Sequence, residues 1–462
     1  MSAPLVWILF PGLLAGLLLS FHRRELLVSI VATLVALLLA GLALWLPTEE
    51  QIFVGSWTFS FSETYSIFGR QFILAATDRP TLMVLYLGTA LWFGAANIAR
   101  TGSLFVPLGF GMVVLLTAAI AVEPFLYAAL LIEMAVLLSI PFLAGEGRRV
   151  GPGVLRYLTF QTLGMPFILF AGWMLSGIEV SPGELDLVLQ ATILLGLGFV
   201  LLLAIFPFHT WIPMLTQEAH PFAAAFVLVL LIGGVSFFGL GFINRFAWLR
   251  EASNLYQILR TVGVVMVVTS GLWSAFQRRL DRMLGYAIIF ETGMSLVSLG
   301  LRDGQSPSIH LSLFFASLLP RGLAFGLWAL ALSVVRFKTP DLSFRSVQGM
   351  GRIAPVACGS LVLAHLSVAG LPLLAGFPLR LTLLEGLAQA APVLAFWTML
   401  GNAGFLAGGL QILAMLVMGK QETGWQLTES YVQIIYLIVG VLALLAVGLF
   451  PQSFLPVFAH FP

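Results

Sequence analysis

Residues 366–386 read LSVAGLPLLAGFPLRLTLLEG, an apolar stretch interrupted by glycine and proline. The stretch lies within an apolar run from residue 354 to residue 390. One helix needs roughly 20 residues to cross a bilayer core, so this run is too long for a single straight helix. The interrupting residues are Gly370, Pro372, Gly376 and Pro378. We therefore predict a broken or re-entrant helix, whose freed backbone groups must be satisfied by protein or water.

Similar apolar runs follow one another along the whole chain. Hydrophobic residues make up 60% of the 462 residues and charged residues only 9%, whereas soluble domains carry roughly 25% charged residues. We predict an all-α polytopic membrane protein with about fourteen transmembrane helices. The predicted spans are residues 4–20, 26–46, 80–99, 103–121, 124–144, 154–176, 187–206, 221–243, 257–276, 282–300, 309–335, 354–390, 392–418 and 431–455.

Basic residues gather in alternate loops, as in the pairs Arg23–Arg24, Arg148–Arg149 and Arg278–Arg279. The positive-inside rule places these loops in the cytoplasm and both termini outside. We expect an integral protein of a bacterial inner membrane. The first span has no basic residues ahead of it, which indicates a retained helix and not a cleaved signal peptide. The longest gap, residues 47–79, contains the strand-like stretch IFVGSWTFSF, which could form a small hairpin over the outer face.

Composition excludes several classes of function. Lys and Arg number 22 against 20 Asp and Glu, and no basic run is interleaved with aromatic residues, so we expect no nucleic-acid partner. The single cysteine, Cys358, excludes an internal disulfide and any multi-cysteine zinc or iron–sulfur site. Because every loop is short, nucleotide, flavin or iron–sulfur chemistry must belong to another chain. We expect no cofactor, no metal and no redox centre here.

A few charged residues sit inside the apolar runs, where a charge costs at least a few kcal/mol and is usually kept for a partner or a water path. They are Glu133, Glu291, Arg321, Arg380 and Glu385. Glu133 stands in LLIEMAVLLSIPF with no charge within nine positions. It is either a protonated carboxyl held by a hydrogen bond or a proton-accepting site set by burial and a nearby cation.

Glu291 is expected near the membrane midplane, about ten residues into its helix. His310 and Arg321 follow on the next span and stand eleven residues apart, which is about three helical turns and keeps them on one face. Together they indicate a polar axis through the protein. The alternative is a structural ion pair that locks two helices together.

The segment PFHTWIPMLTQEAHPF, residues 207–222, contains three prolines that preclude a continuous helix. It carries His209, Glu218 and His220, whose spacing matches no metal-ligand signature. A helix break that places imidazoles at the mouth of a water path is the favoured interpretation.

In the opening stretch, Arg380 and Glu385 lie five residues apart and diverge on a regular helix. His365 lies just upstream of them. We expect the two charges to face different partners. Alternatively, the break is only a packing kink.

Four stretches resemble the antiporter-like membrane subunits of respiratory complex I, a family that includes Mrp-type cation/proton antiporters. PFHTWIP with Glu218 resembles the family's PFHxWLPxAxxEAP, and RRLDRMLGYAIIFETGM resembles DxKRLLAYSSISHMG. RFKTPDLSFRSVQGMGRIAP resembles RxGTxDIxxLxGLxRxxP, and LSVAGLPLLAGFPLR resembles LSLxGLPPxxGFxGK. The resemblance covers roughly residues 65–455 and keeps the four motifs in order.

The resemblance implies a fourteen-helix bundle with two inverted five-helix repeats, each with one broken helix. Residues 101–418 would form this core, with repeats at about 103–276 and 282–418. N-terminal helices and an outer loop (1–100) would precede it, and a C-terminal helix (419–462) would follow. By position, Glu133 matches the family's buried glutamate, while Arg321 and Arg380 stand where lysines are expected. The implied partners are other membrane subunits of a complex I-like or Mrp-like assembly.

The departures from the family pattern concern protonatable residues. The lysine that pairs with the family glutamate should fall near Gly233 or Gly234, and none is there. Asp281 replaces a lysine, and Glu291 replaces a histidine. Arginine stays charged at physiological pH, unlike a buried lysine. We expect Arg321 and Arg380 to act as fixed countercharges to the carboxylates and not as relay stations.

The leading hypothesis is a proton-translocating, antiporter-like subunit of a complex I-type NADH:quinone oxidoreductase. The alternatives are a proton-inactive structural paralogue in such a complex, an Mrp-type Na⁺/H⁺ antiporter subunit, or a proton-driven uptake subunit for inorganic carbon. The candidate proton-pathway residues are Glu133, His209, Glu218, Glu291, His310, Arg321, His365, Arg380 and Glu385.

Overall fold

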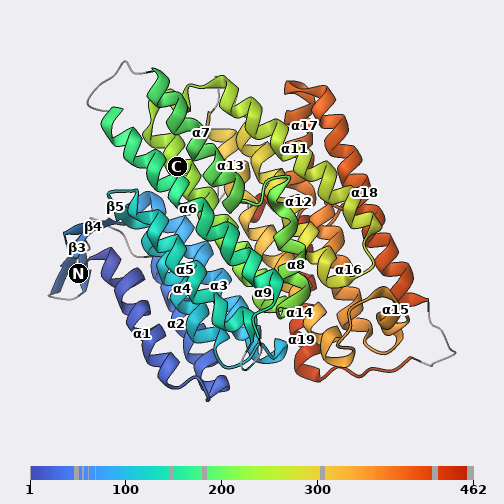
Figure 1. Cartoon of the computed structure of the whole chain (residues 1–462). Helices are drawn as coiled ribbons and strands as arrows, with labels where there is room; N and C mark the ends of the chain where they lie inside the picture. Colours follow the sequence, from blue (N-terminus) through green and yellow to red (C-terminus); the bar gives the residue numbers. More distant parts are fainter. Residues whose placement is uncertain are drawn as a thin grey trace. The chain divides into compact units, whose positions relative to one another are not determined.

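The computed structural model is built almost entirely of helices (Figure 1). It describes residues 2–45, 51–54, 57–60, 62–67, 69–145, 147, 149–178, 185–301, 307–418 and 425–454. Among these residues, ten helical spans are long and apolar enough to cross a membrane. They contain α2 (Glu25–Trp45), α3 (Arg79–Ala99), α5 (Tyr127–Ala144), α6 (Pro152–Ile178), α9 (Pro221–Arg245), α11 (Ser253–Phe276), α12 (Leu280–Gly300), α14 (Leu318–Lys338), α18 (Pro392–Val417) and α19 (Tyr431–Leu449).

Shorter helices connect or extend these spans. Three are apolar: α1 (Phe10–Ser20), which continues the π-helix Leu5–Leu9, α4 (Phe105–Ala121) and α7 (Leu185–Leu202). The others are α8 (Trp211–Glu218), α10 (Ala247–Arg250), α13 (Pro307–Ala316), α15 (Phe344–Val347), α16 (Pro355–Ala369), α17 (Phe377–Ala390) and α20 (Pro451–Phe454).

The exposed faces of the long helices are apolar. Helix α19 is an example: more than half of the surface is exposed in Ile435, Val439 and Leu442. Only 17% of the residues in its most apolar stretch of 18 are buried. Such faces are stable only against lipid or another apolar chain. The prediction of a polytopic, helical membrane protein is confirmed.

The chain divides into two compact units. Unit 1 comprises Met1–Gly94, Gly102–Trp211 and Leu230–Glu251, and unit 2 comprises Ala95–Thr101, Ile212–Val229 and Ala252–Pro462. Unit 1 holds the strands. β1 (Gln51–Val54) pairs antiparallel with β2 (Trp57–Ser60), the hairpin predicted for the strand-like stretch, and β4 (Arg70–Ile73) pairs with both β3 (Thr64–Ile67) and β5 (Val122–Glu123).

The predicted break in the run 354–390 is present in unit 2. Helix α16 ends at Ala369 because Gly370 adopts a left-handed conformation with φ of 78°, which glycine tolerates without strain. Helix α17 begins at Phe377 with Pro378 in its first turn, where a missing N–H is harmless. The chain can fold back between the two helices because Gly376 has no side chain: a Cβ there would overlap the Ser367 carbonyl oxygen.

Helices α11 and α12 pack backbone to backbone through glycine. A Cβ at Gly263 would lie 2.6 Å from the Gly293 carbonyl oxygen, and one at Gly293 would lie 2.7 Å from the Gly263 carbonyl oxygen. Glycines of this kind let membrane helices approach closely. The contact fixes the middle of α12, where Glu291 lies.

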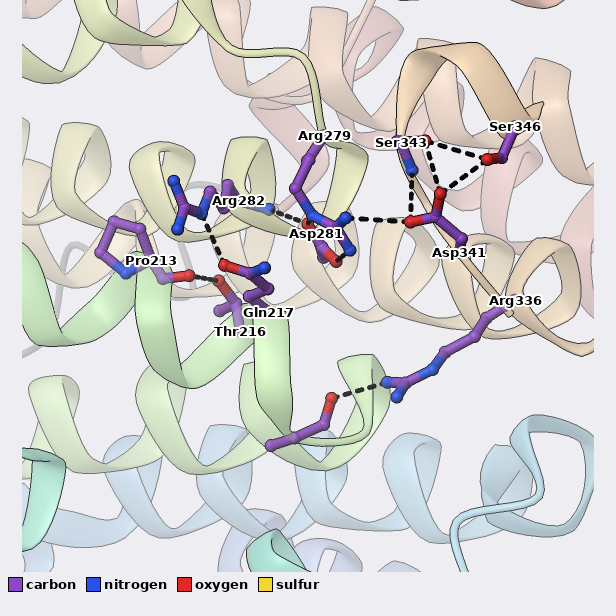
Figure 2. Close-up of polar contacts among 11 residues, drawn as sticks. Pro213, Thr216, Gln217, Arg279, Asp281, Arg282, Arg336, Asp341, Ser343 and Ser346 are labelled. Carbon is purple, nitrogen blue, oxygen red and sulfur yellow. Dashed lines mark hydrogen bonds and ion pairs between the residues drawn. The ribbon is translucent and has the colours of Figure 1, made fainter. Parts of the chain in front are cut away.

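A polar network joins the start of α12 to the segment before α15 (Figure 2). Arg279 donates to Asp281 at 2.8 Å and to Asp341 at 2.9 Å. Asp341 also accepts 2.6 Å hydrogen bonds from the hydroxyls of Ser343 and Ser346. The Asp281 carboxylate lies in the first turn of α12, where its negative charge is stabilised by the positive end of the helix dipole.

Two further hydrogen bonds join residues near this network to α8 and to Ala219, the residue that follows α8. Arg282 donates from Nε to Gln217 Oε1 at 2.7 Å, and Arg336 donates from Nη1 to the Ala219 carbonyl oxygen at 2.7 Å (Figure 2). The segment predicted to be broken by three prolines is indeed discontinuous: α8 ends at Glu218 and α9 begins at Pro221.

Candidate functional site

Glu291 is the centre of the polar cluster in unit 2. It lies in α12, and its side chain is 12% exposed. One carboxylate oxygen accepts a hydrogen bond from Arg380, and the other lies 3.6 Å from Arg321 Nη2. Three helices, α12, α14 and α17, therefore meet at a single carboxylate.

Arg380 reaches the cluster because the helix breaks at Gly370. It donates from Nη2 to the Val368 carbonyl oxygen at 3.0 Å. Val368 belongs to the last turn of α16, whose carbonyls have no partners within the helix, so the guanidinium satisfies a group that the break exposes. Its Cζ also lies 5.1 Å from the centre of the Phe290 ring, a cation–π distance.

Arg321 is held by two serines. It donates from Nη2 to Ser295 and, at 3.3 Å, to the hydroxyl of Ser317. Ser295 donates in turn to the Glu291 carbonyl oxygen at 2.8 Å. Each serine lies one helical turn from a charged residue of its own helix, Ser295 from Glu291 and Ser317 from Arg321. The arginine side chain is only 6% exposed. Its charge is therefore positioned by α12 and α14 together.

The cluster borders a cavity of about 40 Å³, measured as the space that the centre of a water molecule can occupy. A single water needs about 10–15 Å³ of this space, so the cavity has room for about three water molecules. Its polar lining consists of Glu291, Arg321, Arg380, Ser295, Ser298, Ser317 and Ser367. Solvent at this place can solvate charges that apolar surroundings alone would penalise.

Glu133 lies in unit 1, on α5, and has a different environment. Its Oε1 accepts a 2.6 Å hydrogen bond from Thr162 on α6, while Oε2 is buried without a hydrogen-bond partner among the described residues. The side chain is only half-buried. The family lysine was expected near Gly233 or Gly234. A Cβ at Gly233 would meet no atom within 4 Å, and one at Gly234 would lie 3.0 Å from Leu116 Cδ2.

No imidazole is among the described residues that line the cavity. His365 is buried, hydrogen-bonds through Nε2 to the Phe405 carbonyl oxygen at 2.9 Å and stacks on the Phe405 ring. His209 belongs to unit 1, in the 3₁₀ turn Phe208–Thr210, and stacks on Phe206. His310 belongs to α13, and its side chain lies outside the described residues.

The two remaining candidates lie at helix surfaces in unit 2. Glu218 is half-buried at the last position of α8. Glu385 is exposed on α17, five residues beyond the buried Arg380. The structure thus brings Glu291, Arg321 and Arg380 together. The other unit 2 candidates whose side chains it describes, His365, Glu218 and Glu385, do not line the cavity.

The sequence reasoning missed the serines. Ser295 follows Glu291 by four residues, and Ser317 precedes Arg321 by four, so each shares a helix face with a buried charge. That spacing is the signal that could have found them. Ser367 gave no such signal, since the break at Gly370 sets its position. Among the described residues, no three His, Cys, Asp or Glu side chains gather as a metal site.

Comparison with known proteins gives the same family as the four motifs. Residues 157–406 match the family model described as "NADH:quinone oxidoreductase/Mrp antiporter, TM". NADH-quinone oxidoreductase subunit N 2 of Acidobacterium capsulatum is 30% identical over 273 residues, 54% of this chain and 53% of that relative. Subunit 13 of Thermus thermophilus is 27% identical over 402 residues, 81% of each chain.

Two solved structures share the fold. A chain of respiratory complex I from Thermus thermophilus superposes with a TM-score of 0.77 at 21% identity, covering 99% of this chain and 98% of that one. A chain of the Mrp complex from Dietzia sp. gives 0.79 at 16% identity, covering 99% and 96%. The family model covers more than half of the sequence, and this chain therefore belongs to the NADH:quinone oxidoreductase/Mrp antiporter transmembrane family.

Proposed function

We propose that this chain is a proton-translocating, antiporter-like membrane subunit of a complex I-type NADH:quinone oxidoreductase. One observation carries the proposal: Glu291 lies between two buried arginines, at a helix break, beside a cavity with room for water. Structural ion pairs also occur in membrane bundles, but a cavity at the pair provides the solvent that proton transfer requires.

Glu291 carries the only carboxylate among the described side chains that line the cavity. Arg321 and Arg380 keep their charges. A proton arriving through cavity water would neutralise Glu291 and weaken its attraction to both guanidiniums. Its departure would restore that attraction. The arginines thus act as fixed charges whose pull on the carboxylate changes with each transfer.

The remaining candidates Glu133, His209, Glu218, His310, His365 and Glu385 complete the proposed pathway. We propose other membrane subunits of such an assembly as the partners and the bacterial inner membrane as the location, with both termini outside. Ten long spans, three shorter apolar helices and the broken pair α16–α17 would supply fourteen crossings. Two inverted five-helix repeats within residues 101–418 remain part of the proposal.

The test is proton flux into vesicles that contain the assembled complex. Glu291→Gln should lower the flux at least about tenfold, since it removes the titrating group. Arg321→Lys keeps a charge but loses the forked geometry, and a smaller loss is expected. Glu251→Gln changes an exposed carboxylate after α10 and serves as the control. Unchanged flux in Glu291→Gln with normal assembly would refute the proton role.

A second candidate is a structural subunit in which the relay has been lost. The environment of Glu133 favours it: among the described residues, its carboxylate accepts a hydrogen bond from Thr162, and the expected lysine position is glycine. In that case the Glu291 and Arg321 variants should lose assembly or change nothing, never flux alone. A flux that follows a sodium gradient would instead favour an Mrp-type Na⁺/H⁺ antiporter, and dependence on inorganic carbon would favour an uptake subunit.

A further inference from the structure

The polar cluster in unit 2 has more positive than negative charge. Arg321 and Arg380 are both buried, and Glu291 is the only acidic side chain among the described residues that line the cavity. One carboxylate can balance one guanidinium. A second guanidinium without a counterion in apolar surroundings is costly, because few dipoles replace its lost hydration.

Two residues that line the cavity each carry a buried hydrogen-bond donor with no partner among the described residues. Arg321 Nε and Ser367 Oγ are both inaccessible to solvent and unpaired among the described residues, and both residues line the cavity. Leaving such donors unsatisfied in apolar surroundings is unfavourable, because each has lost its hydrogen bonds to water. The other two hydroxyls at Arg321 are already in use, because Ser295 and Ser317 donate to backbone carbonyl oxygens.

An unbalanced positive charge, with unpaired donors in the same lining residues, favours an acceptor that carries one negative charge. We infer that the cavity beside Arg321, Arg380 and Ser367 binds one small monovalent inorganic anion, of the size of chloride or bicarbonate. Water in the cavity would leave the positive charge unbalanced. The space has room for about three water molecules and suits a small anion.

The bound anion would sit beside the carboxylate that the proposed function uses, so the two negative charges compete for the same guanidiniums. Anion affinity should therefore rise when Glu291 is neutral. This relation links anion occupancy to the protonation of Glu291, although the binding site itself does not depend on proton translocation by the chain.

The test is binding of radiolabelled chloride to the purified full-length chain in its assembled complex, with gluconate as the balancing salt. We expect saturable binding of one chloride per chain that unlabelled bicarbonate competes away and gluconate does not. Glu291→Gln should tighten binding about tenfold, and Arg321→Gln should weaken it at least about tenfold, since a neighbouring charge is removed in each case.

A matched pair of serines keeps the test independent of the charged variants, which could fail to fold. Ser367→Ala removes a cavity donor without changing any charge and should weaken chloride binding severalfold. Ser360→Ala changes a buried serine two turns earlier on α16 that does not line the cavity, and it should bind like the wild type. Folding of each variant is checked by thermal unfolding and by assembly.

The inference fails if the wild type shows no saturable chloride binding, or if Ser367→Ala and a folded Glu291→Gln both bind like the wild type. Loss of proton flux in Glu291→Gln without any chloride site would keep the proposed function and remove the anion site. Chloride binding by the wild type together with unchanged proton flux in Glu291→Gln would keep the anion site and refute the proposed function.

Discussion

Asp341 shows how one exposed carboxylate can hold the segment that links α14 and α15. Hydrogen bonds from the Ser343 and Ser346 hydroxyls, followed by the Arg279 guanidinium, lower the pKa of its carboxyl. The folded-state pKa therefore lies below the unfolded value of about 3.9. The resulting stabilisation is complete above that pH and is lost as the pH falls through the folded-state pKa.

Asp341→Asn should therefore be less stable than the wild type at pH 7, and the difference should shrink below about pH 4. The side chain is 51% exposed, so the loss at pH 7 should not exceed about 1 kcal/mol. The measurement is the midpoint of thermal unfolding in detergent at each pH. Glu251→Gln, which removes another exposed carboxylate, is measured alongside as the control. A difference that grows as the pH falls would contradict the assignment.

At the level of single residues, the charges were predictable and their neighbours were not. Glu291, Arg321 and Arg380 stand out because a charge inside an apolar run requires an explanation. Serine is common in membrane helices and does not by itself indicate a site. The hydroxyls around Arg321 could therefore be identified only from the packing of the helices. Glu133 was predictable as a candidate by the same rule, but its threonine partner was not.

The close contact between α11 and α12 allows a prediction at the level of the element. Gly293→Ala would place a methyl group 2.7 Å from the Gly263 carbonyl oxygen and 2.9 Å from the Met266 Cβ. The two helices would have to separate, at a cost of about 1–3 kcal/mol. Glu291 lies two residues away, so proton flux in vesicles should fall together with thermal stability.

Gly359→Ala on α16 provides the matched control for this helix contact. A Cβ at Gly359 would meet no atom within 4 Å. Its stability should be unchanged or higher by up to about 1 kcal/mol, because alanine favours a helix over glycine. Equal losses in the two variants would show that the glycine contact does not hold α11 against α12.

Local sequence predicted the breaks in the helices, because glycine and proline act within a few residues of their own position. Gly370 ends α16, and Pro378 lies in the first turn of α17. Sequence could not predict which helix lies against which. The pairing of Gly263 with Gly293 depends on the register between two helices, and no pattern in either helix alone encodes that register.

For the whole molecule, composition was sufficient to predict a membrane protein, and the motifs were sufficient to predict its family. Sequence reasoning expected Arg321 and Arg380 to act as countercharges to carboxylates, but it could not say that both would meet at Glu291, because that depends on how α12, α14 and α17 pack. The structure supplies that convergence in unit 2.

The orientation in the membrane can be tested with cysteine labelling, because Cys358 is the single cysteine and is buried. In a Cys358→Ser background, Glu251→Cys and Gln348→Cys place thiols at exposed positions. Three predicted crossings, α11, α12 and the span Leu311–Lys338, lie between them. An odd number of crossings puts the two positions on opposite sides of the membrane.

A membrane-impermeant maleimide should therefore label Glu251→Cys in intact cells and Gln348→Cys only after permeabilisation. The positive-inside rule gives this direction, because Arg336, Lys338, Arg345 and Arg352 flank Gln348. Labelling of both from the same side would contradict the number of crossings. Labelling with the sides exchanged would keep that number and reverse the proposed orientation, which would also move both termini to the cytoplasm.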